Sequence, residues 1–587
     1  MERWILRRKG ADFDAISEKF GINPITARLI RNKDIIGEEA IDFYLNGSLS
    51  DLHDGMMMKG MGAAIGILME KINEGQRIRI IGDYDIDGVN ATYILLEGLS
   101  FLGAVVDYDI PHRIEDGYGL NRDLITRAYQ DGIDTIVTCD NGIAATEEIY
   151  YAKELGMTVV VTDHHEIPYV MDGEDKDYII PPADAVIDPK QPGCFYPFKG
   201  LCGAAVAYKL VEALCEVMGQ DAYELDYLIE NVAIATVGDV MELIDENRIF
   251  VKEGLQMLSR THNKGLQSLI DICGLDRNKI TAYSIGFVLG PCINASGRLD
   301  SAKMSLELLL AKTKGEADRL AGELKALNDS RKNLTTEAVE QGKEMIEASS
   351  LKQDRVLVLY LQGCHESLAG IVAGKIREAY YKPTLVITDG EEGLKGSARS
   401  IDDYHMYEEL NKCQHLLTKF GGHEKAAGFS LTKDNLIPLR KLLNQNCSLT
   451  EENLQEKVVL DMQLPFEYIT LDLIEDLEKL EPYGNGNKKP VFVLKNISIR
   501  RASILGKNRN VMKLQLKDPY GVELEALMFK SQFEPLFTCI TEKYGEATVR
   551  NLEAGREMNI LMDMTFYPEI NDFRGVKNVQ LKVTHFR

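Results

Sequence analysis

The chain has 587 residues, of which 45% are hydrophobic and 27% are charged. This balance is typical of folded proteins and excludes a disordered, collagen-like or low-complexity chain. At roughly 100–200 residues per domain, the length predicts about three to five domains. No stretch reaches the roughly 20 apolar residues of a membrane helix, and the basic N-terminus lacks the apolar run of a signal peptide. We therefore expect a soluble, unprocessed cytoplasmic protein.

The formal net charge is −24, which by itself argues against a nucleic-acid binder, because such proteins neutralise phosphates with Lys and Arg. The charge is uneven, however: from residue 481 to residue 587 there are 17 Lys and Arg against 12 Asp and Glu. Acidic residues in the rest of the chain can also serve as metal ligands. The ten cysteines include no C-x-x-C pair, so the sequence indicates neither a zinc site nor a disulfide framework.

In chain order, residues 1–70 form a mainly helical N-terminal segment. Residues 71–240 alternate apolar strands with helices, which predicts an α/β domain with a parallel sheet. Three of these strands end in polar clusters: Asp83, Asp85 and Asp87 after the first, Asp140 after the second, and Asp163, His164 and His165 after the third. Because ligands bind beyond the carboxyl ends of strands in such sheets, we expect the clusters to meet at one edge.

The remaining sequence predicts three further parts. Residues 241–350 form a helical connector with long amphipathic stretches. Residues 351–450 form a second α/β domain with two glycine-containing turns, at residues 395–400 and 420–429. Residues 455–587 contain short strand-like runs, which predict a small β domain of about five strands, as in an OB-fold.

The strongest chemical signal is the run Asp83-Tyr84-Asp85-Ile86-Asp87-Gly88, which lies between an apolar strand and a helix expected to start near Asn90. Its three carboxylates would repel one another unless a cation neutralised them. Oxygen ligands of this kind suit Mg²⁺ or Mn²⁺. The alternatives are a solvated turn or an EF-hand loop, but the twelfth position from Asp83 is Ile94 rather than the Glu of an EF-hand.

The other acidic and histidine positions are weaker signals when each is taken alone. Asp140 could be a helix N-cap, one of His164 and His165 could satisfy polar groups of the core, and Asp239 follows an ordinary apolar helix. Together, carboxylates and one imidazole from four segments could hold two divalent ions. Such a pair, roughly 4 Å apart, suits hydrolysis of a phosphate ester.

These motifs, in this order, resemble those of the DHH phosphoesterase superfamily. The second α/β domain resembles the DHHA1 domain of that superfamily through Gly363-Cys364-His365, Ser397-Ala398-Arg399 and Gly421-Gly422-His423. Within the superfamily, the chain resembles the RecJ family of single-stranded-DNA-specific exonucleases over roughly residues 78–587. The resemblance implies a DHH domain, a helical connector, a DHHA1 domain and an OB-like nucleic-acid-binding domain.

The resemblance also implies the residues of a catalytic site. The implied catalytic set is Asp83, Asp85, Asp87, Asp140, His164, His165 and Asp239. Within it, Asp85, Asp87, Asp140, His164 and Asp239 match the family's metal ligands, and Asp140 matches the bridging carboxylate. Whether Asp83 and His165 ligate directly is left open. The implied cofactor is a pair of Mn²⁺ or Mg²⁺ ions.

Substrate contacts follow from the same resemblance. Arg113, Ser397 and Arg399 would recognise a 5′ phosphate, and Arg298 would hold nearby backbone. The other implied substrate-binding residues are His365, Gly421, Gly422 and His423. In the β domain, a basic group and two stacking candidates could bind single strands: Arg500, Arg501, Lys507, Arg509 and Lys513, with Phe529 and Tyr567. Taken alone, a single Arg is more often part of a surface ion pair, and a strand aromatic is more often core.

The expected function is a single-stranded-DNA exonuclease of DNA repair and recombination that releases 5′-mononucleotides in the 5′→3′ direction. The resemblance further implies a helicase and a single-strand-binding protein as partners, and a monomer is expected. One alternative is a DHH phosphodiesterase of short oligonucleotides or cyclic dinucleotides, or a pyrophosphatase. Those proteins generally lack a basic β domain and tend to carry His where this chain has Ile81. A non-catalytic DNA-binding scaffold is the third hypothesis.

Overall fold

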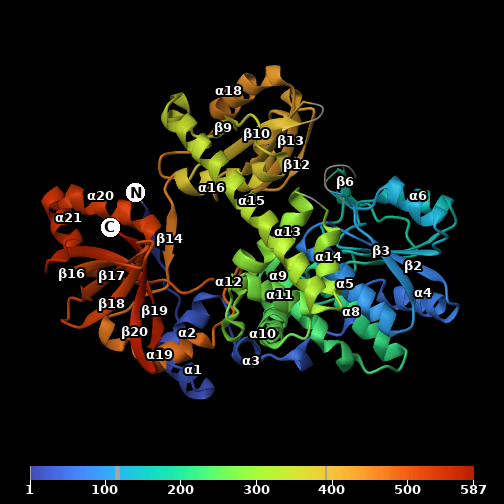
Figure 1. Cartoon of the computed structure of the whole chain (residues 1–587), viewed down its shortest axis with the longest axis horizontal. Helices are drawn as coiled ribbons and strands as arrows, with labels where there is room; N and C mark the ends of the chain where they lie inside the picture. The colour runs from blue at the N-terminus through green and yellow to red at the C-terminus, as the bar shows by residue number, and fades with distance from the viewer. Residues whose placement is uncertain (1, 113–118, 174, 300, 391–392) are drawn as a thin grey trace. The chain divides into compact units, whose positions relative to one another are not determined.

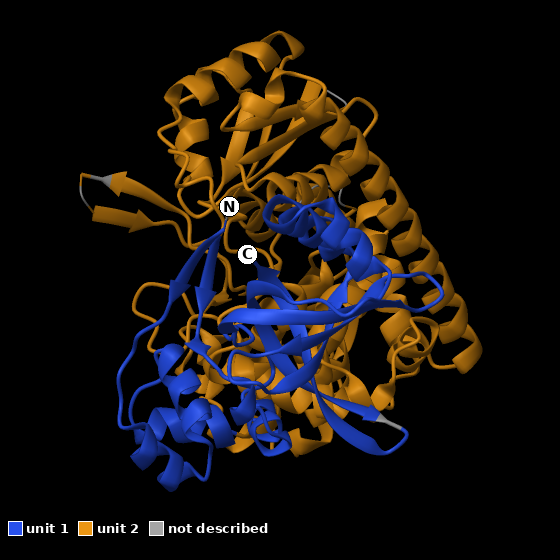
Figure 2. Cartoon of the chain, turned by 90° about the vertical axis from the view of Figure 1, so that its left-hand side faces the viewer, with its two compact units in different colours: residues 1–47, 457–483, 487–587 blue, residues 48–456, 484–486 orange. Residues whose placement is uncertain are grey.

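The computed structural model describes residues 2–112, 119–173, 175–299, 301–390 and 393–587. The chain divides into two compact units, which Figure 2 shows in different colours. The larger unit comprises residues 48–456 and 484–486, and the smaller unit comprises residues 1–47, 457–483 and 487–587. Within the described residues, no helix combines the length and the apolar character needed to cross a bilayer.

The larger unit begins with the predicted parallel sheet, of which Figure 1 labels β2 and β3. This sheet has five strands in the order β3-β2-β4-β5-β8. Its central strands are apolar and almost fully buried, as in sheets covered by helices on both faces. The strands are β2 (Arg77–Gly82), β3 (Val105–Asp109), β4 (Thr135–Cys139), β5 (Thr158–Thr162) and β8 (Ala185–Ile187). The accompanying helices are α4 (Met61–Asn73), α5 (Ile86–Phe101), α6 (Arg122–Gln130), α7 (Thr146–Glu154) and α8 (Gly203–Val217), and a hairpin of β6 (Tyr169–Asp172) and β7 (Asp175–Tyr178) precedes β8.

The predicted helical connector shares its hydrophobic core with this sheet. Leu306 and Leu324 of the connector belong to the same buried cluster as Ile80 of β2 and Leu95 of α5. Helix α9 (Ile229–Gly238) ends the predicted first α/β domain. The connector helices are α10 (Asp245–Ser259), α11 (Lys264–Ile272), α12 (Ala282–Ser284), α13 (Gly290–Leu299), α14 (Lys303–Leu310) and the long α15 (Lys314–Glu347). The connector helices are therefore packed against the first α/β domain.

The second α/β domain contains a mixed sheet in the order β12-β13-β11-β10-β9. Its elements are β9 (Leu357–Tyr360), α16 (Ala369–Tyr380), β10 (Thr384–Gly390), β11 (Gly393–Arg399), α17 (Met406–Asn411), β12 (Lys419–Gly422), β13 (Ala426–Leu431) and α18 (Leu436–Asn446). The predicted turn at residues 395–400 is wrong, because these residues belong mostly to strand β11, whereas residues 420–429 do contain a turn, which joins β12 to β13 in an antiparallel hairpin. Gly396 lies inside β11, opposite Phe429 of β13. A Cβ on this residue would come within 2.2 Å of the Phe429 ring, so the glycine leaves room for that ring.

The smaller unit contains the predicted β domain. Strands β16 (Phe492–Leu505), β17 (Val511–Lys517), β18 (Glu523–Phe529), β20 (Val576–Phe586) and β19 (Ile560–Phe573) pair in that order. A further pairing of β16 with β19 closes these five strands into a ring, and β15 (Met462–Gln463) adds to β16. The helices of this region are α19 (Leu471–Glu478), α20 (Phe533–Tyr544) and α21 (Glu546–Glu553). This closed five-stranded sheet agrees with the predicted OB-like fold.

The N-terminal residues 1–47 pack in this smaller unit. Strand β1 (Arg3–Leu6) pairs in parallel with β14 (Lys457–Leu460). Helices α1 (Phe13–Phe20), α2 (Pro24–Asn32) and α3 (Glu38–Asn46) share its core, in which Leu29 and Ile30 are buried with Leu473. The segment that the sequence grouped as 1–70 is thus divided, and α4 belongs to the first α/β domain.

Candidate metal centre and substrate contacts

The carboxyl ends of three neighbouring strands carry the acidic residues singled out by the sequence. Strand β4 pairs with both β2 and β5, and all three run in the same direction. Asp83, Asp140 and Asp163 each follow directly after one of these strands and are 2% exposed or less. The structure therefore brings them to one edge of the sheet.

The Asp83–Gly88 run passes from strand into helix sooner than the sequence suggested. Helix α5 starts at Ile86, four residues before the predicted start, because Asp85 acts as its N-cap. The Asp85 Oδ1 atom accepts hydrogen bonds from the amides of Asp87 and Gly88 at 2.9 and 3.1 Å. Gly88 is needed here for close approach, since a Cβ would lie 2.4 Å from the Asp83 carbonyl oxygen. The carboxylates thus stand on a tightly fixed backbone.

Asp87 is buried at the start of helix α8. Its Oδ2 atom accepts a hydrogen bond from the Gly203 amide at 2.7 Å, and its Oδ1 atom accepts one from Ala204 at 2.8 Å. Both donors are among the unpaired amides of the first helical turn, where negative charge is favoured. The sequence reading missed Gly203 and Ala204. The signal that could have indicated them is the small-residue run Gly203-Ala204-Ala205 at the start of a helix.

Asp140 has a backbone conformation that L-residues rarely adopt. Its φ is +59°, and the side-chain amide of the next residue, Asn141, fixes the turn by donating to the carbonyls of Ile81 and Cys139 at 3.0 and 2.9 Å. Helix α7 begins only at Thr146, so Asp140 is not a helix N-cap. Strain of this kind at a buried charged residue is a mark of functional sites.

His164 points its Nε2 atom into the carboxylate cluster. This atom lies 3.0 Å from Asp140 Oδ1, 3.4 Å from Asp87 Oδ2 and 3.8 Å from Asp239 Oδ2. Asp239 enters the cluster as the C-cap of α9, and Val240 after it has φ +60°. The His164 Nδ1 atom is buried without a hydrogen-bond partner among the described residues. Burial lowers the pKa of His164, which favours the neutral imidazole that metal ions bind.

Asp163 organises the two histidines. Its Oδ1 atom accepts hydrogen bonds from the His164 amide at 2.7 Å and from the His165 amide at 3.2 Å, and it lies 2.8 Å from His165 Nδ1. Its Oδ2 atom accepts from the Ile143 amide. Burial acts to raise the pKa of Asp163, but the bond and charge of His165 outweigh it and hold that pKa below its usual value. This is the carboxylate–histidine pairing that orients imidazoles around metals.

The donor atoms form one continuous cluster. Three groups each have ligand atoms within 4.8 Å of one another: Asp83, Asp85 and Asp140; Asp140, His164 and His165; and Asp87, His164 and Asp239. Asp140 and His164 each belong to two groups, so all seven side chains are linked.

The electrostatics of the cluster fit divalent cations. Burial, followed by the charge of Asp85, raises the pKa of Asp83 well above its usual value. Burial, followed by Asp87 and Asp85, raises the pKa of Asp239 to about 8. Asp83 and Asp239 are thus unfavourable as anions without a counter-charge, and carboxylate oxygens with imidazole nitrogen suit Mn²⁺ or Mg²⁺.

A second group of titratable residues has a different character. His53, Asp245 and Glu246 also place donor atoms within 4.8 Å of one another. The Lys209 ammonium, however, lies 3.2 Å from Glu246 Oε2 and donates to the His53 carbonyl at 2.6 Å. Tyr196 donates to the other Glu246 oxygen. The Lys209 ammonium already neutralises Glu246, the one buried member of the group, so this group is a structural network.

In the second α/β domain, Ser397 and Arg399 lie on strand β11 beside the start of α16. The Arg399 Nη1 atom donates to Ser397 Oγ at 3.2 Å and to the Ala398 carbonyl at 2.8 Å. A Cβ on Gly370 would lie 2.8 Å from Arg399 Nη2 and 2.9 Å from Ser397 Oγ. Gly370, which the sequence reading missed, thus allows a guanidinium, a hydroxyl and the first turn of a helix to share one corner. Such groups together suit a phosphate, and we call the place where Ser397, Arg399 and the first turn of α16 meet the phosphate corner.

Two other candidate substrate-binding residues, Arg298 and His365, contact the turn that precedes α16. Arg298 on α13 donates from Nη1 to the Ser367 carbonyl at 3.0 Å, and His365 Nδ1 lies 2.7 Å from Ser367 Oγ. Ser367 belongs to the turn that precedes α16. Arg298 therefore links the connector to the second α/β domain. Arg113 lies outside the described residues.

Gly421, Gly422 and His423 lie at the end of strand β12 rather than in an isolated turn. Gly421 pairs with Gly428 across the ladder, and a Cβ on either residue would meet nothing within 4 Å. Gly422 has φ +151°, and a Cβ there would clash with the Ala426 carbonyl oxygen at 2.4 Å. The His423 amide donates to that same carbonyl at 2.8 Å. The paired glycines leave bare backbone that a ligand can approach closely.

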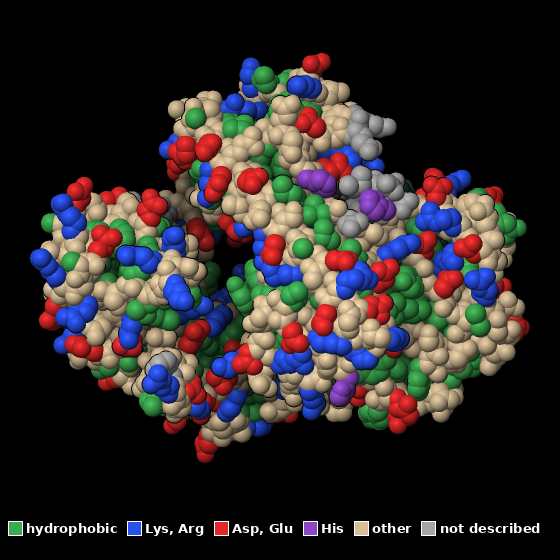
Figure 3. Space-filling view, viewed as in Figure 1, with side chains coloured by type: hydrophobic (Ala, Val, Ile, Leu, Met, Phe, Trp, Pro, Cys, Tyr) green, Lys and Arg blue, Asp and Glu red, His purple; other side chains and the backbone are tan. Residues whose placement is uncertain are grey.

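The OB-like domain places its two stacking candidates differently. Tyr567 is 7% exposed and belongs to the core, so its ring face is not available for stacking. Phe529 is 41% exposed, with the Lys582 ammonium 4.9 Å from its ring centroid. Of the predicted basic residues, Arg500 pairs with Glu557 and Lys513 with Glu525. On the visible surface in Figure 3, basic and acidic side chains are interspersed over the smaller unit.

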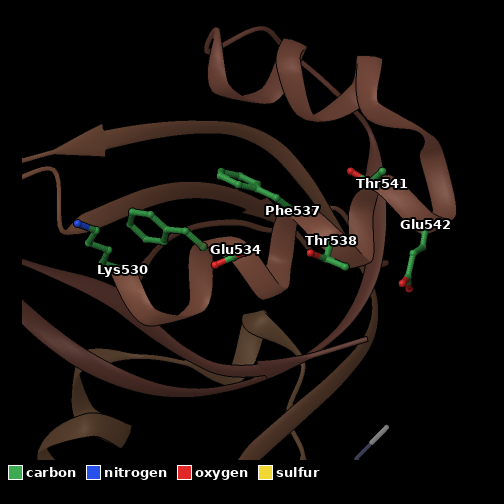
Figure 4. Close-up of a pocket in the computed structure, with 7 residues that line it drawn as sticks. Lys530, Glu534, Phe537, Thr538, Thr541 and Glu542 are labelled. Atoms are coloured by element: carbon green, nitrogen blue, oxygen red, sulfur yellow. The ribbon is translucent and has the colours of Figure 1, made fainter. Parts of the chain in front are cut away.

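A pocket of about 470 Å³ lies along helix α20 of the smaller unit (Figure 4). Its lining comes from that helix and the turn before it and comprises Lys530, Phe533, Glu534, Phe537, Thr538, Thr541 and Glu542. None of these residues is a metal-ligand or phosphate-binding candidate. The pocket therefore does not belong to the candidate metal centre.

Comparison with known protein families matches three parts of the chain. Residues 77–236 match the DHH family N-terminal domain, residues 353–449 match the DHHA1 domain, and residues 460–585 match the RecJ OB domain. The single-stranded-DNA-specific exonuclease RecJ of Bacillus subtilis is 34% identical over 586 residues, covering 99% of this chain and 70% of the relative. The RecJ of Haemophilus influenzae is 31% identical, and the match covers 100% of this chain and 99% of the H. influenzae protein. The chain belongs to the RecJ family.

Solved structures of RecJ proteins support this assignment. RecJ from Thermus thermophilus in complex with Mn²⁺ has a TM-score of 0.79 and 26% identity, covering 100% of this chain and 79% of that chain. The same protein in complex with Mg²⁺ has a TM-score of 0.75 and 25% identity, covering 100% and 78%. The family resemblance and the predicted fold class are thereby confirmed. The chain thus comprises a parallel-sheet DHH domain, a helical region, a mixed-sheet DHHA1 domain and a C-terminal OB domain.

Proposed function

We propose that this chain is a two-metal exonuclease that degrades single-stranded DNA from the 5′ end and releases 5′-mononucleotides. The observation that carries the proposal is the convergence of seven acidic and imidazole side chains at one edge of the DHH sheet. Membership of a family whose relatives are named single-stranded-DNA-specific exonucleases supports the substrate.

Two Mn²⁺ or Mg²⁺ ions would be held by Asp85, Asp87, Asp140, His164 and Asp239. Asp140 would be shared between them, because it belongs both to the group with Asp83 and Asp85 and to the group with His164. Bound there, the ions would supply Lewis-acid polarisation of a phosphodiester and neutralisation of its developing charge. The T. thermophilus relative was solved with either metal, which supports this choice of ions.

Hydrogen bonds within the chain hold these candidate metal ligands, which together form the metal cradle, in place. Asp163 fixes both histidines through three hydrogen bonds, and the α8 amides fix Asp87 through two. Preorganised ligands do not have to reorganise during the reaction, which is the main contribution that a protein makes at such a site.

The proposed strand polarity rests on the phosphate corner, whose residues around Arg399 suit a phosphate. Arg399, Ser397 and the start of α16 would bind a terminal 5′ phosphate, and the bare backbone at Gly421 would contact the adjacent nucleotide. Arg298 joins the DHH side to this corner through Ser367. Seating the 5′ end there would present the following phosphodiester to the metal cradle. The matched RecJ OB domain favours long strands over the short oligonucleotides of the alternative phosphodiesterase hypothesis.

The test uses one single-stranded oligonucleotide labelled in parallel at its 5′ end and at its 3′ end, with a duplex and a dinucleotide for comparison. In Mn²⁺, we expect the 5′ label to appear at once as mononucleotide while the 3′ label passes through a descending ladder. The duplex should be cut slowly. A ladder from the 5′ label would contradict the polarity, and cleavage of the dinucleotide alone would favour the alternative.

A further inference from the structure

Two thiols outside the metal centre face each other at short range. Cys273 caps the C-terminus of α11 and is partly exposed, whereas Cys292 lies in the first turn of α13 and is fully buried. Their sulfur atoms are 3.8 Å apart. A disulfide needs about 2.05 Å between sulfur atoms, so a displacement of roughly 1.8 Å would close the bond. This displacement is within reach of side-chain rotation combined with a small helix shift.

The surroundings of Cys292 favour its thiolate. The Asn328 side-chain amide of α15 donates to its sulfur at 3.2 Å, and Arg331 holds the other end of that amide by donating to Asn328 Oδ1 at 3.1 and 2.9 Å. The interaction with Cys273, followed by burial acting the other way and by the bond from Asn328, gives Cys292 a pKa of about 7. A thiolate in such surroundings is a competent nucleophile toward sulfur.

We propose that Cys273 and Cys292 form a reversible dithiol–disulfide switch, in which oxidation ties α11 to α13 and slows the nuclease. The oxidant is a peroxide. Hydrogen peroxide first oxidises the Cys292 thiolate: its sulfur takes up one OH group as a sulfenic acid, and the other oxygen of the peroxide leaves as hydroxide, which is protonated to water. The Cys273 thiol then attacks that sulfur, its proton joins the sulfenic hydroxyl, and a second water leaves. A dithiol reductant reverses the change by exchange.

Helix α13 connects this pair to the reaction centre. Asn294, two residues after Cys292, accepts the Ile86 amide at 2.9 Å and so fixes the loop that carries Asp85 and Asp87. Gly297 packs so closely on the Tyr84 carbonyl oxygen that a Cβ would come within 2.5 Å. A shift of α13 would therefore move the metal-ligand loop. A displacement of about 1 Å in a catalytic constellation can cost up to about 100-fold in rate.

The test treats the full-length protein with hydrogen peroxide, removes the excess, and maps disulfides by mass spectrometry of non-reduced peptides. We expect a Cys273–Cys292 linked peptide that disappears after tris(carboxyethyl)phosphine. In parallel, turnover of single-stranded DNA in Mn²⁺ should fall at least about threefold and recover on reduction. The turnover readout rests on the proposed function, whereas the peptide map does not, so the two can fail separately.

Matched variants assign the effect to this pair. Cys273→Ser should keep full turnover and lose its sensitivity to peroxide, while Cys447→Ser, which removes another partly exposed thiol, should remain sensitive. Absence of the linked peptide in the oxidised wild type would overturn the proposal. A linked peptide with unchanged turnover would also overturn it as a switch, as would equal inhibition of Cys273→Ser.

Discussion

At the scale of single residues, Asp140 combines features that an ordinary surface carboxylate never shares. It has φ +59°, is 2% exposed, and lies 3.0 Å from the His164 Nε2 atom. Burial, followed by the charges of Asp87 and Asp85, raises its pKa well above the usual value. Such a residue costs stability in the metal-free protein, and the cost is understandable if it holds cations.

Asp140→Asn should reduce exonuclease turnover at least about 1,000-fold, because several kcal/mol of stabilisation of the charge in the transition state is lost. The fold should survive, since Asn has the same shape and readily adopts a positive φ. The measurement is turnover of labelled single-stranded DNA together with a circular dichroism spectrum. Asp226→Asn, a half-buried carboxylate outside the metal centre, should behave as wild type. Turnover of Asp140→Asn within tenfold of wild type would refute the shared-ligand role.

Arg399→Ala should reduce the preference for a 5′-phosphorylated end, because in our proposal the guanidinium, which lies beside Ser397, binds the terminal phosphate in a bidentate way. Competition between 5′-phosphate and 5′-hydroxyl strands should show the ratio of kcat/KM falling about tenfold, the value of one charged hydrogen bond. The matched control is Arg319→Ala, which removes an exposed arginine paired with Glu323 on α15. An unchanged ratio in Arg399→Ala would remove Arg399 from the phosphate corner.

The raised carboxylate pKa values predict how stability depends on pH without metal. Asp239, with a pKa of about 8, keeps its proton in the folded state at pH values where the unfolded chain, with a pKa near 4, has released it. Asp239 therefore contributes most to folding at low pH, and this contribution is lost as the pH rises from about 4 to 8.

Thermal unfolding in a chelator should accordingly show a lower Tm at pH 8 than at pH 5.5. Adding Mn²⁺ should raise the Tm more at pH 8, because the ions bind the deprotonated ligands. In Asp239→Asn the difference in Tm between pH 5.5 and pH 8, both measured in chelator, should be smaller. A Tm in chelator that rises toward pH 8 would show that the carboxylates are stabilised by other means.

At the scale of elements, helix termini and close glycines position the ligands. Helix α8 presents two amides to Asp87, α5 is capped by Asp85, and α9 delivers Asp239 at its C-cap. Gly203 is critical in this arrangement, since a Cβ there would lie 2.7 Å from the Asp140 Cβ and 2.9 Å from its Cα. The backbone of one helix thus packs directly against the backbone of a ligand residue.

Gly203→Ala should weaken Mn²⁺ binding by about 10–100-fold, the usual cost of disturbing the groups that orient metal ligands. Isothermal titration calorimetry with Mn²⁺ measures this directly. The matched control is Gly66→Ala in helix α4, where a Cβ would meet nothing within 4 Å, so it should leave binding unchanged and stabilise the helix by about 1 kcal/mol. Equal affinities for the two variants would show that the packing at Gly203 does not matter.

At the scale of the whole molecule, the two ends of the chain belong to one unit. Strand β1 pairs with β14, and Asn32 on α2 donates to the Asp461 carbonyl at 3.0 Å. The candidate metal centre lies entirely in the other unit. The N-terminal residues, for which the sequence offered no function, thus help to build the unit that carries the OB domain.

Deleting residues 1–47 should therefore destabilise the smaller unit without dismantling the metal centre. Hydrogen exchange should show lost protection in α19 and in β14, whereas β2 and β4 remain protected. Mn²⁺ binding by the truncated chain should match that of the full chain. Loss of protection spread evenly over both units would contradict this division.

The sequence predicted the strand-end clusters because strong hydrophobic runs define parallel strands and fix which residues follow them. It also located the five strands of the OB domain. It could not locate the α5 start, since Asp85 was assigned to a loop although its oxygen caps the helix. Gly203 and Gly370 were missed because their role depends on tertiary contacts with distant residues. Tyr567 was offered as a stacking residue, and only the closed sheet shows it to be core.

The central claim is that this cluster holds two divalent ions. The most direct test is an anomalous difference map from a crystal of the protein grown with Mn²⁺, recorded at the manganese absorption edge. We predict two peaks, each within about 2.5 Å of an Asp140 oxygen, with Asp85, Asp87, His164 and Asp239 as the surrounding ligands. A map with no peak at this edge of the sheet, or with peaks bound only by other residues, would contradict the account.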